Sequence, residues 1–223
     1  MSDYSQAIQT IAVYAIPVLF AISLHEASHG YVARYFGDNT AAQLGRLSLN
    51  PIKHIDPIGT ILLPLLLYFA SLPPFGYAKP TPINYNNLRN PKKQMGFVAA
   101  AGPFSNFAMG LGWMLLGVIF TAMGVQEEFL LLMCQAGVAT NAMMFVINMI
   151  PIPPLDGGSV VVSLLPRDLS EKYARLERYG MFVFIGLVLL LNTGPFRGLI
   201  ARLIYMVFEL FAFLLIPVRI LLN

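Results

Sequence analysis

Two histidines and a glutamate follow the pattern H-E-x-x-H within an otherwise apolar stretch. They are His25, Glu26 and His29. On a helix, positions i and i+4 lie on one face, so both imidazoles can bind one metal ion while Glu26 acts on a nearby water molecule. Ionisable side chains are costly to bury in an apolar span and usually mark a functional site. The alternative, histidines bonded only to backbone carbonyls in a helix bundle, explains the pattern less well.

A catalytic zinc ion normally has three protein ligands, and Asp156 is the best candidate for the third. The single cysteine, Cys134, cannot form a thiolate cluster. Asp156 follows a proline-rich run that ends an apolar stretch at membrane depth, where irregular backbone is tolerated only against protein or a water-filled cavity. Gly157 and Gly158 allow a close turn that aims Asp156 back toward the cavity. The alternative is that Asp156 caps the next helix, but an incomplete zinc site favours the ligand.

The composition indicates the environment in which these residues work. Hydrophobic residues make up 57% of the 223 residues and charged residues 11%, and the mean hydropathy is +0.68. Soluble domains are about 45–50% apolar and about 25% charged, so the chain is predicted to be an integral membrane protein with the lipid bilayer as a partner. The net charge of +3 is too weak to indicate nucleic-acid binding.

Several segments are long and apolar enough to position this site by crossing a membrane, which takes about 20 residues. The sequence predicts spans at 8–36, 96–123, 129–149, 174–192 and 200–222. Segment 58–72 is short and broken by proline, which favours a re-entrant or interfacial element. Segment 76–87 is predicted to form a β-hairpin at the membrane surface.

The predicted fold is therefore an all-α polytopic membrane protein. It is a bundle of five to six transmembrane segments with a small β-hairpin or re-entrant element. No repeat or shift in composition divides the chain, so residues 1–223 are predicted to form one membrane-embedded domain.

Basic residues predict the orientation of this domain. They gather in the two polar connections before the second long span, and such connections lie in the cytoplasm. Both can do so only if 58–72 enters the membrane and returns. The metal motif then lies toward the cytoplasmic side of the cell (plasma) membrane, and the last span ends inside, near Arg219.

Taken together, these motifs resemble the site-2 protease family of intramembrane zinc metalloproteases. The first family motif is the H-E-x-x-H pattern. The second, N-x-x-P-x-P-x-x-D-G, is matched by Asn148, Pro151, Pro153, Asp156 and Gly157. An A-G-P-x-S-N element, which opens the next helix of the family, is matched by Ala101, Gly102, Pro103, Ser105 and Asn106. The segment 45–59 resembles the compact branch without PDZ or nucleotide-sensing domains.

The resemblance implies a single metalloprotease domain with one Zn²⁺ per chain. It implies that His25, His29 and Asp156 bind the metal, that Glu26 is the catalytic base, and that Asn148 is a catalytic residue near the reacting carbonyl. The implied substrate is a membrane protein, cleaved in or near a transmembrane segment. The edge of the predicted hairpin could hold an unwound substrate by strand addition.

Other interpretations stay open at this point. A metal-binding membrane transporter or a non-catalytic membrane scaffold is the alternative function, although Glu26 between the ligands favours hydrolysis. His54 is either a fourth ligand or gate, or a surface histidine bonded to a neighbouring carboxylate. Asn106 either lines the cavity or bonds backbone across helices. The sequence indicates neither the substrate nor the oligomeric state.

Overall fold

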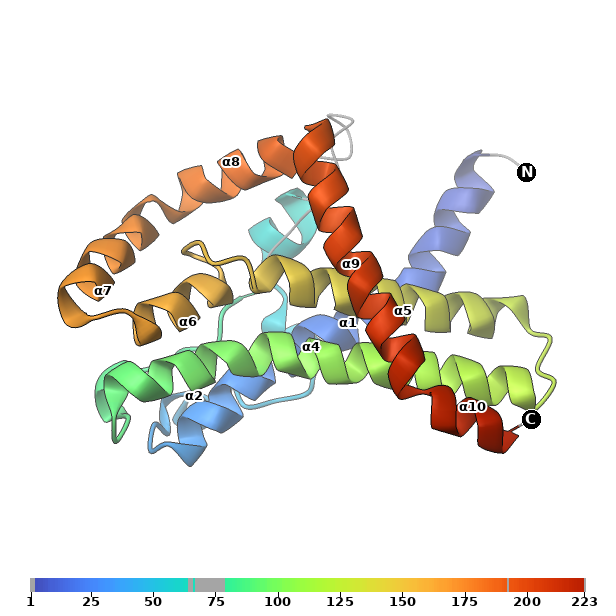
Figure 1. Ribbon diagram of the computed structural model, residues 1–223, viewed down its shortest axis with the longest axis horizontal. Coiled ribbons are helices and arrows are strands. Elements are labelled where there is room, and N and C mark those ends of the chain that lie inside the picture. The colour runs from blue at the N-terminus through green and yellow to red at the C-terminus, as the bar shows by residue number, and fades with distance from the viewer. Residues whose placement is uncertain (1–2, 64–65, 67–78, 192, 223) are drawn as a thin grey trace.

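The chain folds almost entirely into helices, as the computed structural model shows (Figure 1). It describes residues 3–63, 66, 79–191 and 193–222. The α-helices are α1 (Asp3–Tyr35), α2 (Thr40–Gln43), α4 (Pro91–Ala122), α5 (Glu128–Asn148), α6 (Asp156–Leu164), α7 (Arg167–Ala174), α8 (Gly180–Leu191), α9 (Gly194–Leu214) and α10 (Ile216–Leu222). Shorter turns are η1 (Pro51–His54), η2 (Pro57–Leu62), η3 (Tyr85–Asn87) and η4 (Arg175–Tyr179).

Three helices in the described part of the chain, α1, α4 and α5, are each long and apolar enough to cross a membrane. Helices α9 and α10 form a fourth candidate, bent by 47° at the break between them. The chain is therefore a membrane protein that is mainly helical in its described residues, but the predicted count of five to six spans is not confirmed. Segment 174–192 differs most from its prediction, because η4 interrupts it and α8 has only 12 residues. Such a helix is about 18 Å long, short of the hydrocarbon core of about 30 Å.

Helix α4 starts earlier than the hydropathy pattern predicts. It begins with Pro91 in its first turn, a position where the missing N–H costs nothing. The charged residues Lys92 and Lys93 keep this first turn out of the apolar window. The A-G-P-x-S-N element consequently lies inside α4 and does not open a helix.

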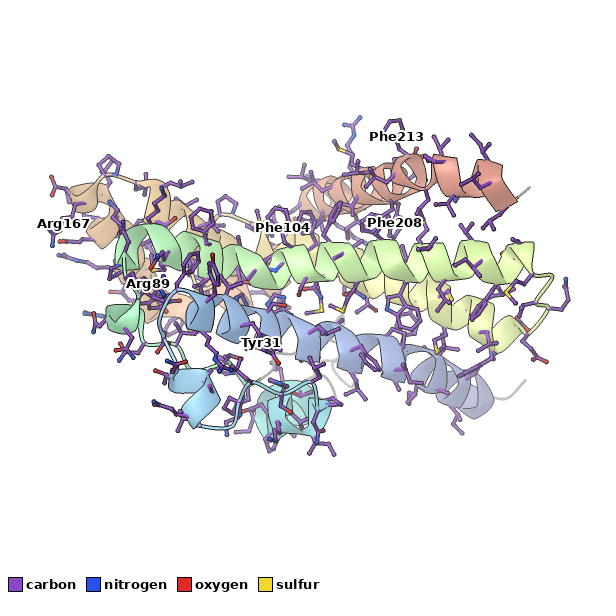
Figure 2. All side chains as sticks on the ribbon, turned by 90° about the horizontal axis from the view of Figure 1, so that it is seen from below. Tyr31, Arg89, Phe104, Arg167, Phe208 and Phe213 are labelled. Atoms are coloured by element: carbon purple, nitrogen blue, oxygen red, sulfur yellow. The ribbon has the colours of Figure 1, made fainter. Side chains whose placement is uncertain are left out.

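Helix α4 is the centre of the bundle. Helices α1, α5 and α6 pack against it, and α1 also contacts α5. Figure 2 shows α1 and the α9–α10 pair on opposite sides of α4. Phe211 of α9 is completely buried against α4 and α5, and a Cβ at Gly110 would lie 2.7 Å from its ring. The core therefore depends on a glycine that lets two helices approach closely.

The predicted hairpin at 76–87 is not confirmed. Residues 79–84 are extended without strand pairing, and residues 85–87 form η3; positions 76–78 lie outside the described residues. Pro80 and Pro82 lack the N–H groups that a strand ladder requires. The N–H of Lys79 bonds the His54 carbonyl and that of Asn84 bonds Asp38. A substrate strand would therefore find few free donors here, and we do not retain the strand-addition hypothesis. Of the predicted 58–72 element, η2 is described and most of the rest lies outside the described residues.

Candidate metal centre

His25, His29 and Asp156 meet in a buried cluster between α1 and the start of α6. The two Nε2 atoms are 3.2 Å apart, and the Asp156 carboxylate oxygens lie 3.2 Å from His25 Nε2 and 3.5 Å from His29 Nε2. Their side chains are 8%, 10% and 20% exposed, respectively. Asp156 follows the two histidines by more than about 120 positions in the sequence, yet all three residues present ligand atoms to one point.

The hydrogen bonds on the far side of each imidazole define which nitrogen carries the proton. His29 Nδ1 lies 2.7 Å from the Val98 carbonyl oxygen, which can only accept. His25 Nδ1 lies 2.6 Å from Asn106 Oδ1. Both Nδ1 atoms are therefore N–H donors, and both Nε2 atoms carry lone pairs, as metal-binding imidazoles require.

When each imidazole carries its proton on Nδ1 only, three acceptors face one another in this cluster. Asp156 Oδ2 is buried, and no hydrogen-bond donor in the described part of the chain reaches it. Such a cluster is repulsive unless a cation joins it. Ligand atoms around tetrahedral zinc lie about 3.3–3.4 Å from one another, given Zn–N distances of about 2.0–2.1 Å. The observed separations fit a zinc ion.

The turn between α5 and α6 aims Asp156 at the histidines. A Cβ at Gly157 would lie 2.5 Å from the carbonyl oxygens of Met149 and Ile150, and one at Gly158 would lie 2.4 Å from the Pro153 nitrogen. Only glycine permits such a close return of the chain. Asp156 is the first residue of α6, but its carboxylate faces the histidines, so helix capping does not account for it.

Gly102 of α4 makes room for the two imidazoles. A Cβ at this position would lie 2.4 Å from His29 Nε2 and 2.7 Å from His25 Cε1. Real Cβ atoms do not approach so closely, so any larger residue would displace the ligands. The glycine of the A-G-P-x-S-N element therefore has a steric role in the site.

Glu26 follows His25 on α1 and is held by the extended segment 79–84. The Thr81 N–H donates to Glu26 Oε2 at 2.6 Å, and the Thr81 hydroxyl donates to the Glu26 carbonyl at 2.9 Å. Thr81 is 8% exposed. One oxygen of the candidate base is thus fixed by the backbone, while the carboxylate remains half-buried beside the site.

The structure does not bring Asn148 or His54 into the cluster. The Asn148 amide donates to the Met144 carbonyl one turn back on α5, at 3.0 Å. His54 is fully buried, and its Nε2 lies 2.7 Å from the Ser48 carbonyl oxygen. The interpretation of His54 as a surface histidine bonded to a carboxylate is therefore wrong, because η1 folds its ring inward against the backbone.

Thr81 and Asn141 are among the contributors to the site that the sequence does not identify. Thr81 lies between two prolines, a pattern that predicts extended chain but names no partner. Asn141 is a polar residue inside an apolar span, and residues of this kind often have a function. It is completely buried and bonds to Asn106.

A membrane-spanning helix bundle that brings an H-E-x-x-H pair together with a distant aspartate defines the class of membrane zinc metalloproteases. The relatives agree. The "Putative zinc metalloprotease YwhC" of Bacillus subtilis is 35% identical over 179 residues, which are 76% of this chain and 77% of the relative. The chain belongs to the site-2 protease family.

More distant relatives carry the same description. The "Putative zinc metalloprotease Rip2" of Mycolicibacterium smegmatis is 25% identical over 216 residues, covering 93% of this chain and 78% of the relative. The protein of the same name from Mycobacterium tuberculosis strain H37Rv is 26% identical over 196 residues, which cover 86% of this chain and 71% of the relative. No family model matches the chain. No solved structure matches it either.

Proposed function

We propose that this chain is an intramembrane zinc endopeptidase that cleaves a peptide bond in or near a transmembrane segment of a substrate protein. The observation that carries the proposal is the convergence of His25, His29 and Asp156 beside Glu26 on the membrane-spanning helix α1. A storage or transport site needs the ligands but has no use for an adjacent carboxylate base. The named relatives support protease activity, and the location on α1 supports cleavage within the membrane.

Each residue has a defined task in this proposal. His25, His29 and Asp156 would hold one zinc ion, whose chemistry when bound is that of a Lewis acid that polarises the scissile carbonyl and activates water. Glu26 takes a proton from the attacking water and returns it to the nitrogen of the leaving amine. Thr81 holds one oxygen of Glu26 during this transfer. Asn148 would hydrogen-bond the substrate backbone by releasing its amide from Met144.

The substrate must unwind locally before cleavage, because a helix uses its carbonyl groups in its own hydrogen bonds. Water must also reach the site, and the half-buried Glu26 and Asp156 are the groups of the cluster best placed to meet it. The substrate is therefore a transmembrane helix with residues that favour local unwinding.

We further propose that the site faces the cytoplasmic side of the plasma membrane. Arg89 and Arg167 lie at one end of the molecule, and both termini lie at the other (Figures 1 and 2). Basic residues favour the cytoplasm, so both termini would be outside. The sequence predicts a C-terminus on the cytoplasmic side. The proposed orientation differs because the short helix α8 takes the place of one of the predicted membrane crossings.

An experiment on cysteine accessibility tests this orientation. Single cysteines at Asn86, Glu128 and Arg167, in a Cys134→Ser background, would be treated in intact cells with an impermeant thiol reagent. We expect labelling at position 128 only. Labelling at 86 or 167 would contradict the proposed orientation.

Glu26→Gln tests the proposed reaction. Glutamine can still accept the Thr81 N–H bond but cannot take up a proton, so zinc content should be unchanged and cleavage lost. The protein would be placed in lipid vesicles with a single-span substrate, and products identified by mass spectrometry. Glu171→Gln, on the exposed surface of α7, is the matched control.

Two results would contradict the proposal. One is cleavage by Glu26→Gln at the wild-type rate. The other is zinc flux across the vesicles that Glu26→Gln leaves unchanged, together with no cleavage by the wild type, which would favour the transporter.

A further inference from the structure

A chain of two buried amides connects His25 to the interior of the bundle. Asn106 of α4 and Asn141 of α5 are both completely buried. Asn106 Nδ2 donates to Asn141 Oδ1 at 3.0 Å and to the Ala21 carbonyl at 3.2 Å. Asn141 Nδ2 donates to the Gly137 carbonyl at 2.9 Å. Buried amides at membrane depth are costly, which points to a function for the pair.

The direction of this chain is fixed at both ends. The carbonyls of Gly137 and Ala21 can only accept, so each must face an amide nitrogen. Asn141 consequently turns its oxygen toward Asn106, and Asn106 turns its own oxygen toward His25 Nδ1, 2.6 Å away. The orientation of each amide follows from its contacts and leaves one arrangement.

This arrangement decides the tautomer of His25. An amide oxygen at Nδ1 requires an N–H there and leaves the Nε2 lone pair directed at the metal cluster. If Asn106 turned over, its NH₂ group would face Nδ1 and favour the tautomer with a proton on Nε2. That proton would point at His29 Nε2 and Asp156, where a metal ion is needed.

The Nδ1 atoms of the two histidines have acceptors of different kinds. His29 uses the Val98 carbonyl of α4, whose direction the helix backbone fixes. His25 uses a side-chain amide, which could turn over if nothing held it. Two oxygen acceptors on Asn106 Nδ2 oppose this turn, the Ala21 carbonyl and Asn141 Oδ1. Of the two, Asn141 Oδ1 is a side-chain atom and can be removed by substitution.

We propose that Asn141 is a positioning residue that acts through Asn106 to hold His25 in its metal-binding tautomer. The proposal rests on the zinc site proposed above but not on the proteolytic reaction. Asn141→Leu should lower zinc affinity by about 10- to 100-fold, the usual effect of losing an outer partner of a ligand. Thr140→Val, which changes a buried polar neighbour on the same helix, is the matched control and should bind zinc like the wild type.

A second substitution distinguishes positioning from packing. Asn106→Asp presents an acceptor to His25 whichever way the carboxylate turns, so Asn141 is no longer needed to orient it. In the double variant Asn106→Asp/Asn141→Leu, the carboxylate also avoids the Asn141 oxygen, and of the two former oxygen acceptors only the Ala21 carbonyl still faces it. We expect zinc affinity within about threefold of the wild type, since carboxylate–histidine–zinc arrangements bind well. If Asn141 served packing alone, the double variant would be at least as impaired as Asn141→Leu.

Two measurements on the purified full chain provide the test. Zinc affinity is obtained by competition with a chromogenic chelator. The tautomer of His25 is read by ¹⁵N NMR of metal-free, histidine-labelled protein, which reports even if the wild type proves to have no protease activity. We expect a proton on Nδ1 in the wild type and a proton on Nε2 in part of the Asn141→Leu molecules. Unchanged affinity and tautomer in Asn141→Leu, or a double variant that is not restored, would overturn the proposal.

Discussion

Thr81 holds Glu26 with two hydrogen bonds, one to the carboxylate at 2.6 Å and one to the backbone carbonyl at 2.9 Å. The flanking residues Pro80 and Pro82 have no N–H, so Thr81 alone among the three can donate from the backbone. The segment 79–84 is thus attached to the candidate catalytic helix at Glu26, the residue proposed to transfer the proton.

Thr81→Pro should lower turnover and leave zinc content unchanged. It removes the N–H that orients Glu26, and misplacing a catalytic group can cost about 100-fold in rate. Thr81→Val keeps this N–H, loses only the hydroxyl bond and should retain most of the activity. Cleavage rates and zinc content of both variants provide the measurement. Equal activity in Thr81→Pro and Thr81→Val would show that the N–H bond has no catalytic role.

Gly102→Ala should abolish zinc binding. The added Cβ would lie 2.4 Å from His29 Nε2, so the imidazoles must move out of their ligand positions. Gly112→Ala on the same helix is the control, because a Cβ there meets nothing within 4 Å. Replacing that helical glycine should stabilise the protein by up to about 1 kcal/mol. Zinc titration of both variants tests the steric argument, which wild-type zinc binding by Gly102→Ala would refute.

Asp156→Asn should weaken zinc binding, since a neutral oxygen replaces an anionic ligand. His54→Ala should leave zinc affinity unchanged but lower thermal stability, because it empties a fully buried site. Zinc affinity and melting temperature would be measured for each variant. Loss of zinc in His54→Ala with full binding in Asp156→Asn would mean that the third ligand has been misassigned.

Asp38 should make the free energy of unfolding depend on pH in the acidic range. Burial alone raises the pKa of this carboxyl group, but hydrogen bonds from Thr40, Asn87 and Asn84 outweigh it and hold the pKa below the ordinary 3.8. Its stabilising contribution is therefore present above that value and is lost as the pH falls below it. Asp38→Asn should lower stability at neutral pH by about 1–3 kcal/mol.

Thermal unfolding in detergent between pH 7 and pH 3 tests this expectation. The difference between wild type and Asp38→Asn should be largest at pH 7 and shrink toward pH 3. Asp168→Asn, at an exposed position on α7, serves as the control. A difference that stays constant with pH would exclude the ionised carboxylate as its cause.

The number and limits of the membrane spans were only partly predictable. Hydropathy located α1, α4 and α5 because a continuous apolar run of helical length is a property of the local sequence. The span predicted at 174–192 is not confirmed, because the charged turn Arg175–Tyr179 interrupts the helix. Segment 79–84, which contains Pro80 and Pro82, is part of the hairpin predicted at 76–87, but its donors bond to Asp38, His54 and Glu26 instead.

The sequence by itself determined the parts of the site that depend on short-range geometry. His25 and His29 share a face because they stand one helical turn apart, and Gly157 and Gly158 permit the turn that directs Asp156. Only the tertiary structure decided which partners surround them: Thr81 on Glu26, Val98 on His29, and Asn141 behind Asn106 and His25. The physical reason is that helical spacing is set by the backbone of one segment. A buried polar group, in contrast, can satisfy its hydrogen bonds with many partners, and the packing of distant helices selects one of them.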